Sequence, residues 1–149
     1  ILSKIICSNP QAFREFLSSK AFLTYMEAIT EIRLKEKSID ISASLYQNTD
    51  YLLPHDDQLE GRKIAFMIYL SNLEAKDGGK LILYTTKGSI PREEEKAIVP
   101  KFNSFIFFKV SEKSFHEVEE VITNKQRITI GGWFHGAYNK PSIPQKREY

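Results

Sequence analysis

The stretch Ile39-Asp-Ile-Ser-Ala-Ser-Leu45 alternates between apolar and polar side chains at every step. Successive side chains of a β-strand point to opposite faces, so this period of two predicts a strand with one apolar face. That face consists of Ile39, Ile41, Ala43 and Leu45. The pattern begins after Ser38, and we place the start of a β-rich core there.

Five further segments downstream are rich in β-branched and aromatic residues: Ile64–Leu70, Leu81–Tyr84, Phe105–Phe108, Phe115–Val121 and Arg127–Phe134. No segment with helical spacing separates them, and Gly78-Gly79 marks a turn. Short strands at this spacing predict an all-β barrel or sandwich and not a parallel α/β sheet. The intervening segment Lys87–Lys96 contains a glycine, a proline and three consecutive glutamates, and we predict that it is an exposed loop.

The residues before the core have helical spacing. Ser8 or Asn9 can cap a helix that begins at Pro10, because proline loses no hydrogen bond at the first helical position. The apolar residues Phe13, Phe16 and Leu17 then share one face, and a second amphipathic helix is predicted over roughly 20–34. The charged residues 33–37 are expected to form a solvated connector.

The bulk numbers set limits on organisation and function. The 149 residues suit one domain, divided here into a helical support (1–37), a β core (38–136) and a C-terminal tail or linker (137–149). A net charge of +2 gives no electrostatic case for direct nucleic-acid binding, and no apolar run approaches the ~20 residues that cross a membrane. The one cysteine, Cys7, favours a reducing compartment and is assigned no chemistry. Because the chain begins at Ile1, we expect a piece of a longer cytoplasmic or nuclear protein.

Pro54-His55-Asp56-Asp57 is the most informative local motif. Residues two apart in a strand project from the same face, so His55 and Asp57 can reach one metal ion while Asp56 points away. His116 is the best candidate for a third ligand. Two imidazoles and one carboxylate form the facial triad of non-heme iron(II) oxygenases, whose open positions take a 2-oxo acid and dioxygen. Taken alone, the His-x-Asp pattern is weak, because an isolated histidine near a strand end is more often a surface or hydrogen-bonded residue than a metal ligand.

Arg127 and Thr129 lie two residues apart in the last predicted strand and therefore share a face. A guanidinium beside a hydroxyl can hold a buried carboxylate through charge-assisted hydrogen bonds, although an isolated strand arginine is more simply explained by a surface ion pair. Beside the proposed ligands we predict that Arg127 binds the distal carboxylate of a 2-oxo diacid. Tyr46 and Tyr69 can donate phenolic hydrogen bonds to the same carboxylate, or they can be core aromatics.

Two aromatic residues follow in the same strand. His135 has the same parity as Arg127, but Gly131-Gly132 interrupts the pattern, so we interpret His135 as a rim residue and not as a fourth ligand. Trp133 is a candidate for the substrate mouth, with a place in the aromatic core as the alternative.

A series of motifs extends along most of the chain, from about residue 38 to residue 136: Tyr51-Leu-Leu-Pro-His-Asp-Asp57, Gly61-Arg-Lys-Ile-Ala-Phe66, Ile68-Tyr-Leu70, Gly78-Gly79, Leu81-x-Leu-Tyr84, Val99-Pro-x-Phe-Asn103, Phe107-Phe-Lys-Val110, Ser114-Phe-His-Glu-Val118 and Arg127-x-Thr-Ile-x-Gly-Trp-Phe-His-Gly136. Together they resemble the prolyl hydroxylases that modify a small-subunit ribosomal protein.

This resemblance implies a double-stranded β-helix, a cupin-like jelly roll, preceded by helices. It implies hydroxylation of a prolyl residue in a protein with iron(II), 2-oxoglutarate and dioxygen, yielding succinate and CO2, with ascorbate as an optional cofactor. The residues it assigns to iron are His55, Asp57 and His116, and those it assigns to 2-oxoglutarate are Arg127, Tyr69 and Tyr46. Thr129 stands where relatives often carry a serine, which keeps the hydroxyl. Such proteins usually carry more helical sequence before the barrel and a second barrel after it.

Two alternatives remain at this point. The first is a catalytically silent β-barrel that binds a protein partner, against which the complete set of three ligands argues. The second is an oxygenase of the same type that acts on a nucleobase, a lipid or a free amino acid. Only the family resemblance disfavours this second alternative.

Overall fold

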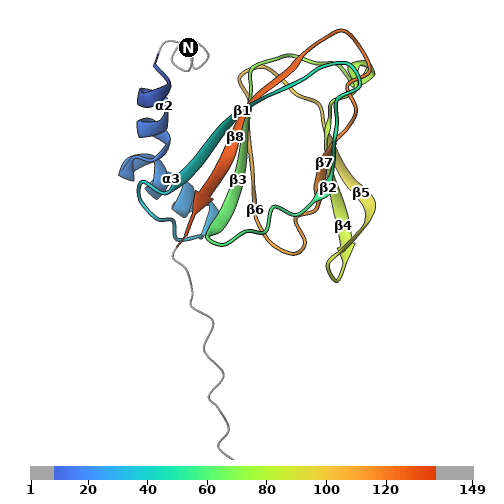
Figure 1. Ribbon diagram of the computed structural model, residues 1–149. Helices are drawn as coiled ribbons and strands as arrows, with labels where there is room; N and C mark the ends of the chain where they lie inside the picture. Colours follow the sequence, from blue (N-terminus) through green and yellow to red (C-terminus); the bar gives the residue numbers. More distant parts are fainter. Residues whose placement is uncertain (1–8, 137–149) are drawn as a thin grey trace, which may run out of the picture.

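Two helices precede a set of antiparallel strands in the computed structural model, which describes residues 9–136 (Figure 1). The elements are α2 (Pro10–Leu17), α3 (Lys20–Thr30), β1 (Ile39–Tyr46), β2 (Leu52–His55), β3 (Arg62–Tyr69), the 3-10 turn η1 (Ala75–Asp77), β4 (Leu81–Lys87), β5 (Ile90–Ile98), β6 (Phe105–Lys109), β7 (His116–Val118) and β8 (Arg127–His135). The strands form two four-stranded sheets, ordered β1-β8-β3-β6 and β2-β7-β4-β5. The expected mainly-β fold with N-terminal helices is confirmed.

Both helices begin at side-chain caps. The Asn9 side chain accepts a hydrogen bond from the backbone N–H of Ala12, and Pro10 follows at the first helical position, as predicted. Ser19 caps α3 in the same way. This helix ends at Thr30, earlier than predicted, because Glu31 has a left-handed backbone with φ of 59°.

The apolar core lies between the helices and the outer face of the first sheet. Phe13 and Leu17 of α2 and Leu23 and Met26 of α3 are buried there against the apolar residues of the sheet, which include Ile39, Ile64, Phe66, Ile68, Ile130 and Phe134. In Figure 1 the helices cover one side of β1, β8 and β3, and the second sheet stands on the other side. The opposite face of the first sheet is therefore free to line a pocket between the sheets.

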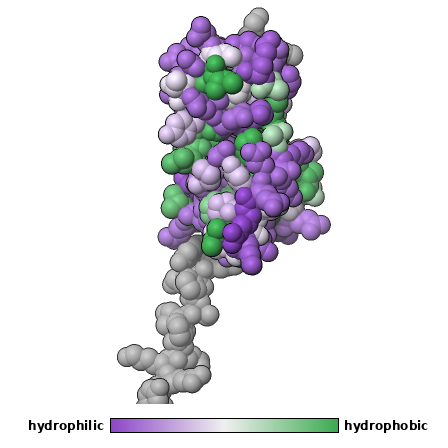
Figure 2. Space-filling model, turned by 90° about the vertical axis from the view of Figure 1, so that its right-hand side faces the viewer, coloured by the Kyte–Doolittle hydropathy of each residue, from purple (hydrophilic) through white to green (hydrophobic). Residues whose placement is uncertain are grey.

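The segment predicted to be an exposed loop, Lys87–Lys96, is instead mostly strand. Ile90–Ile98 forms β5, which pairs with β4 across a tight turn at Gly88, where φ is 62°. β5 is an edge strand whose side chains are mostly exposed, so it has no apolar alternation that the sequence could reveal. Pro91 and the charges of Glu93–Glu95 are typical of an edge strand that must not pair with another chain. The face that carries the second sheet is largely hydrophilic (Figure 2).

Within residues 9–136, neither helix is long and apolar enough to span a membrane. The helices lie before residue 38 and the strands after it, while the division into support, core and tail stays a prediction. The predicted tail, 137–149, and Cys7 lie outside the described residues.

Candidate active site

A cavity of about 250 Å³ lies between the two sheets. Alternate residues of β8 face it, namely Arg127, Thr129, Gly131 and Trp133, while Ile130 and Phe134 face the helices. The register with β3 places Tyr69 beside Thr129, Met67 beside Gly131 and Ala65 beside Trp133. The cavity therefore has an arginine at one end of β8 and a tryptophan towards the other.

The second sheet contributes two histidines to this cavity. His55 is the last residue of β2, and His116 is the first residue of β7. The two residues are directly opposite each other in the antiparallel pair β2–β7, and their ring centroids are 4.3 Å apart. His116 is buried, and its ring also contacts the edge of Phe108. Pairing of two short strands thus brings together residues that are far apart in the sequence.

Asp57 completes the group from a turn and not from a strand. β2 ends at His55, and Asp57 has a left-handed backbone with φ of 63°. The strand alternation invoked from the sequence is therefore the wrong local explanation, although the two residues do converge. Asp56 points elsewhere, as expected, and its carboxylate accepts hydrogen bonds from the backbone and side-chain amides of Gln58.

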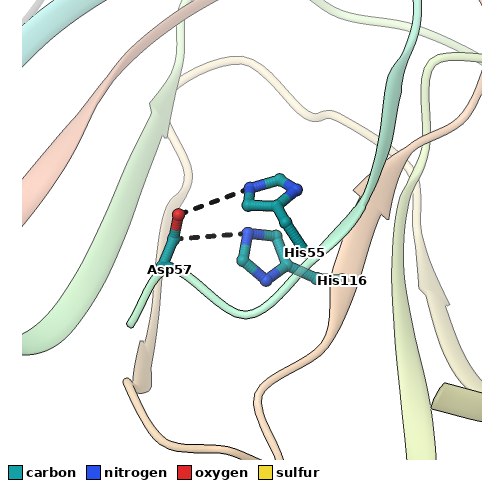
Figure 3. Close-up of side chains that lie close together, drawn as sticks. All are labelled: His55, Asp57 and His116. Atoms are coloured by element: carbon teal, nitrogen blue, oxygen red, sulfur yellow. Dashed lines mark ion pairs between the residues drawn. The ribbon is translucent and has the colours of Figure 1, made fainter. Parts of the chain in front are cut away.

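The three side chains converge as a possible metal site (Figure 3). His55 Nε2 lies 3.3 Å from Asp57 Oδ1, and His116 Nε2 lies 3.4 Å from Asp57 Oδ2. Metals bind imidazole nitrogen and carboxylate oxygen at about 2.0–2.2 Å, which places neighbouring ligand atoms about 3 Å apart. The observed separations are therefore close to those that one metal ion needs.

Backbone carbonyl groups set the orientation of both rings. His55 Nδ1 lies 2.8 Å from the carbonyl oxygen of Leu53, and His116 Nδ1 lies 2.7 Å from that of Ser114. A carbonyl oxygen can only accept, so in each ring Nδ1 is the protonated nitrogen that donates. Nε2 is then the metal-binding nitrogen in both histidines, the outer-sphere arrangement that metal-binding histidines commonly show.

The charges of these three side chains influence one another. Burial acts to raise the pKa of Asp57, but hydrogen bonding to His116 and His55 lowers it well below its usual value. The hydrogen bond to Asp57 raises the pKa of His55 above 6.5, against the opposing effect of burial. A metal ion must therefore displace a proton from this imidazole, so metal affinity should decrease at acidic pH.

Arg127, at the other end of the cavity, is only 1% exposed. Its Nε donates to the carbonyl oxygen of Gly79 at 2.9 Å, and its two terminal nitrogens donate to Thr129 Oγ1 at 3.0 Å and to Tyr69 Oη at 3.4 Å. A guanidinium has five N–H donors, so two remain available. Among the described residues no carboxylate forms a salt bridge with Arg127. A buried cation without a counterion is costly, and the arrangement fits an anionic ligand.

Each predicted neighbour of Arg127 lies beside it. Thr129 and Tyr69 accept its hydrogen bonds through their hydroxyl groups. Burial is the main cause that raises the pKa of Tyr69, so its hydroxyl keeps its proton. Tyr46 contacts Arg127 with the face of its ring, whose centroid lies 5.3 Å from the guanidinium carbon. Its contact with the guanidinium is therefore through its ring, and the predicted hydrogen bond from its hydroxyl to a ligand carboxylate stays a prediction.

The 3-10 turn η1, shortly before Gly79, contains a buried aspartate. Asp77, 1% exposed, accepts hydrogen bonds from the backbone N–H of Glu74, from Lys125 and from Thr123. The hydrogen bond from Lys125 is the main cause that lowers the pKa of Asp77. Nothing in the sequence marks this residue as buried, because an aspartate in a short turn is usually exposed.

Arg62 is a second site residue that the sequence analysis missed. The register between β3 and β8 shifts between Arg62 and Ile64, which adds one residue to β3. Such a bulge reverses the face of the residues before it, so Arg62 lines the cavity although Ile64 faces the helices. Its guanidinium stacks on Trp133, 3.4 Å from the ring centroid. Strict alternation would have placed Arg62 on the other face.

His135 lies at the end of β8, away from the three-residue group. Its Nε2 is 2.9 Å from Asp40 Oδ2, and its side chain is 20% exposed. Trp133 lines the cavity, and the guanidinium of Arg62 stacks on its ring. Its assignment to the substrate mouth stays a prediction.

Comparison with known proteins gives the same picture. The family model of the 2OG-Fe(II) oxygenase superfamily matches residues 41–135. Prolyl 3-hydroxylase OGFOD1 of Xenopus laevis is 47% identical over 132 residues, which is 87% of this chain and 25% of that protein. Prolyl 3,4-dihydroxylase OGFOD1 of Ostreococcus tauri is 38% identical over 130 residues, 82% of this chain and 25% of that protein. The chain thus spans about a quarter of the length of these relatives.

A solved structure supports the fold. The prolyl-4-hydroxylase of Pseudomonas putida superposes with a TM-score of 0.64 and 20% sequence identity, covering 81% of this chain and 63% of that one. At this level of identity the similarity concerns the fold alone. It confirms the predicted double-stranded β-helix.

Proposed function

The chain belongs to the 2OG-Fe(II) oxygenase superfamily, which implies iron(II) and 2-oxoglutarate as cofactors, and from this premise we propose that it contributes the catalytic barrel of a protein prolyl hydroxylase. The proposal rests on one observation above all. A group of two histidines and one aspartate shares a cavity with a buried arginine that has no carboxylate partner among the described residues.

His55, Asp57 and His116 would hold the iron. When bound, iron(II) and 2-oxoglutarate supply the activation of dioxygen and the hydroxylation of a C–H bond, with succinate and CO2 as products. The two imidazoles are oriented for binding by their Nδ1–H hydrogen bonds, and the low pKa of Asp57 keeps its carboxylate ionised. Three ligands leave open positions on an octahedral metal, as this chemistry requires. No further acid or base of the protein is required.

Arg127 would bind the distal carboxylate of 2-oxoglutarate with its two free N–H donors. The hydrogen bonds to Gly79, Thr129 and Tyr69 fix the guanidinium before any ligand arrives, so little entropy is lost on binding. The rings of Tyr46 and Tyr69 exclude water from the charge pair. The cavity is smaller than the roughly 300–1,000 Å³ typical of sites for drug-sized ligands, which suits a five-carbon diacid.

A protein substrate is proposed on the names of the relatives, which are prolyl 3-hydroxylases and a prolyl 3,4-dihydroxylase. We extend the proposal to a small-subunit ribosomal protein as the target on the resemblance of the motifs described above. A cytoplasmic or nuclear location would follow from that substrate.

Anaerobic titration of the purified chain with iron(II) and 2-oxoglutarate tests the cofactor site. We expect a visible charge-transfer band that needs both additions, that is lost in His116→Ala and that persists in His135→Ala. Addition of oxygen and a proline-containing peptide should then yield succinate and a hydroxylated peptide. Absence of the band from the folded wild-type protein would contradict the proposal and favour a silent interaction barrel. Succinate formation that no prolyl peptide stimulates would favour another substrate class.

A further inference from the structure

The indole nitrogen of Trp133 is the one buried side-chain nitrogen or oxygen atom of residues 9–136 that has no hydrogen-bond partner. An indole N–H can only donate, and leaving it buried and unpaired costs free energy. Most such groups in folded proteins have a partner, so an exception calls for a physical explanation.

The surroundings of the indole ring include the Asp57 carboxylate. Trp133 and Asp57 line the same cavity, and the indole is among the groups that act on this carboxylate. Each oxygen of Asp57 faces one imidazole, Oδ1 facing His55 and Oδ2 facing His116. Each oxygen thus has one imidazole beside it and keeps a lone pair that can accept a further hydrogen bond, while the indole N–H has no partner within hydrogen-bond distance.

Arg62 contacts both Trp133 and the turn that carries Asp57. Its guanidinium stacks on the Trp133 ring, and its Nη1 donates to the backbone carbonyl oxygen of Asp57 at 3.4 Å. One side chain thus contacts both the ring and the turn that carries the aspartate. The bulge in β3 is what turns Arg62 towards the cavity.

We propose that Trp133 and Arg62 are positioning residues for the aspartate ligand. A carboxylate that binds a metal ion through one oxygen leaves its second oxygen without a partner, and the indole N–H of Trp133 is placed to donate to it. Arg62 holds the Trp133 ring and the Asp57 turn in fixed positions relative to each other. The inference rests on the proposed function, because it requires that Asp57 binds metal.

Metal affinity tests this role without any turnover. Trp133→Phe keeps an aromatic ring beneath Arg62 and removes only the N–H, and Arg62→Met keeps an apolar side chain and removes the guanidinium. We expect Mn²⁺ to bind about tenfold more weakly to Trp133→Phe, since loss of a partner of a metal ligand typically costs 10–100-fold. Arg62→Met should also bind Mn²⁺ more weakly than the wild-type chain. Arg92→Met, which removes an exposed arginine of β5, is the matched control and should bind as the wild-type chain does.

The wild-type protein offers a second measurement that does not depend on any variant folding. Trp133 is the single tryptophan of the chain, so a spectrum of 15N-labelled protein has one indole N–H signal. Saturation with Zn²⁺ should shift this signal downfield and slow its exchange with solvent. The same addition to His116→Ala should leave the signal in place.

The outcomes separate the inference from the proposed function. If Zn²⁺ binds but the indole signal does not move, and Trp133→Phe binds Mn²⁺ normally, the positioning role is wrong while the metal site stands. If the folded wild-type chain binds no metal, the proposed function fails and the inference fails with it. Equal weakening in Arg92→Met would show that the loss does not come from the site.

Discussion

The two ends of the cavity are built in different ways. The arginine end is built on β8, a nine-residue strand that begins at Arg127. The Arg127 side chain is 1% exposed and donates three hydrogen bonds. The metal end depends on the last residue of an edge strand, the first residue of a three-residue strand and a left-handed turn. The His55 side chain there is 35% exposed.

The two ends should therefore respond differently to substitution. Regular strand geometry already fixes the side chains of the arginine end, so this end is preorganised for its ligand. The metal end is held by hydrogen bonds to carbonyl groups and by the Asp57 turn, so the bound metal itself is expected to contribute much of its rigidity. The following predictions test this contrast from the largest effect to the smallest.

Loss of a metal ligand should have the largest effect. His116→Ala is expected to weaken metal binding by more than about 100-fold, since loss of even an outer-sphere partner costs 10–100-fold. Calorimetric titration with Mn²⁺ measures the change. His135→Ala removes a histidine that also lies at a strand end but pairs with Asp40, and its affinity should be unchanged. A comparable loss in both variants would mean that the three-residue group is not the binding site.

Arg127→Ala should weaken the binding of 2-oxoglutarate and leave metal binding nearly unchanged. Removal of one partner of a buried charge pair costs about 2–5 kcal/mol, so we expect 2-oxoglutarate to bind at least about 30-fold more weakly. Metal binding should change little. The dependence of the charge-transfer band on 2-oxoglutarate concentration measures the first quantity, and Mn²⁺ titration measures the second. An equal loss of both, with the fold intact, would contradict the separate roles of the two ends.

The hydroxyl of Thr129 should make a smaller contribution. Thr129→Ala removes the acceptor of an Arg127 hydrogen bond, and a bond to a charged group contributes about 1.5–3 kcal/mol, so 2-oxoglutarate affinity should fall roughly tenfold. Thr129→Ser keeps the hydroxyl and serves as the control. Affinities measured from the same band should rank wild type and Thr129→Ser together. If serine is as poor as alanine, the methyl group and not the hydroxyl is what matters.

Substitution of Asp77 should have the smallest effect on ligand binding and a measurable effect on thermal stability. Its pKa is lower in the folded protein than the ordinary value of 3.8, so the ionised group favours folding above that value. This contribution disappears as the pH falls through the lower pKa of the native state. Asp77→Asn should therefore melt at a lower temperature than wild type at neutral pH, and the difference should shrink in acid. Thermal unfolding followed by circular dichroism across this pH range measures it. A difference that does not depend on pH would point to packing instead.

The success of the sequence analysis follows the same contrast. Strand alternation correctly predicted that Arg127 and Thr129 share a face, because β8 is regular along its whole pairing with β1. His55 and Asp57 do converge, but through a left-handed turn that alternation cannot anticipate. Regular elements can be inferred from periodicity, whereas turns must be identified by other means.

The remaining errors also have physical causes. Arg62 was missed because a bulge reverses its face, and a bulge leaves no periodic signal. The sequence predicts a loop at β5 because an edge strand that is exposed on both sides has no apolar face. The burial of Asp77 depends on Thr123 and Lys125, which are distant in the sequence.

The double use of β8 has a consequence for how such a protein can change over time. Ile130 and Phe134 pack under the helices, while Arg127 and Thr129 line the cavity. A single-residue insertion or deletion within β8 would exchange the two sets, placing a guanidinium among apolar side chains and an isoleucine at the ligand. Folding and ligand binding would therefore fail together in such variants. Changes in length are tolerated instead at places such as the β4–β5 turn at Gly88, where the space around the backbone is open.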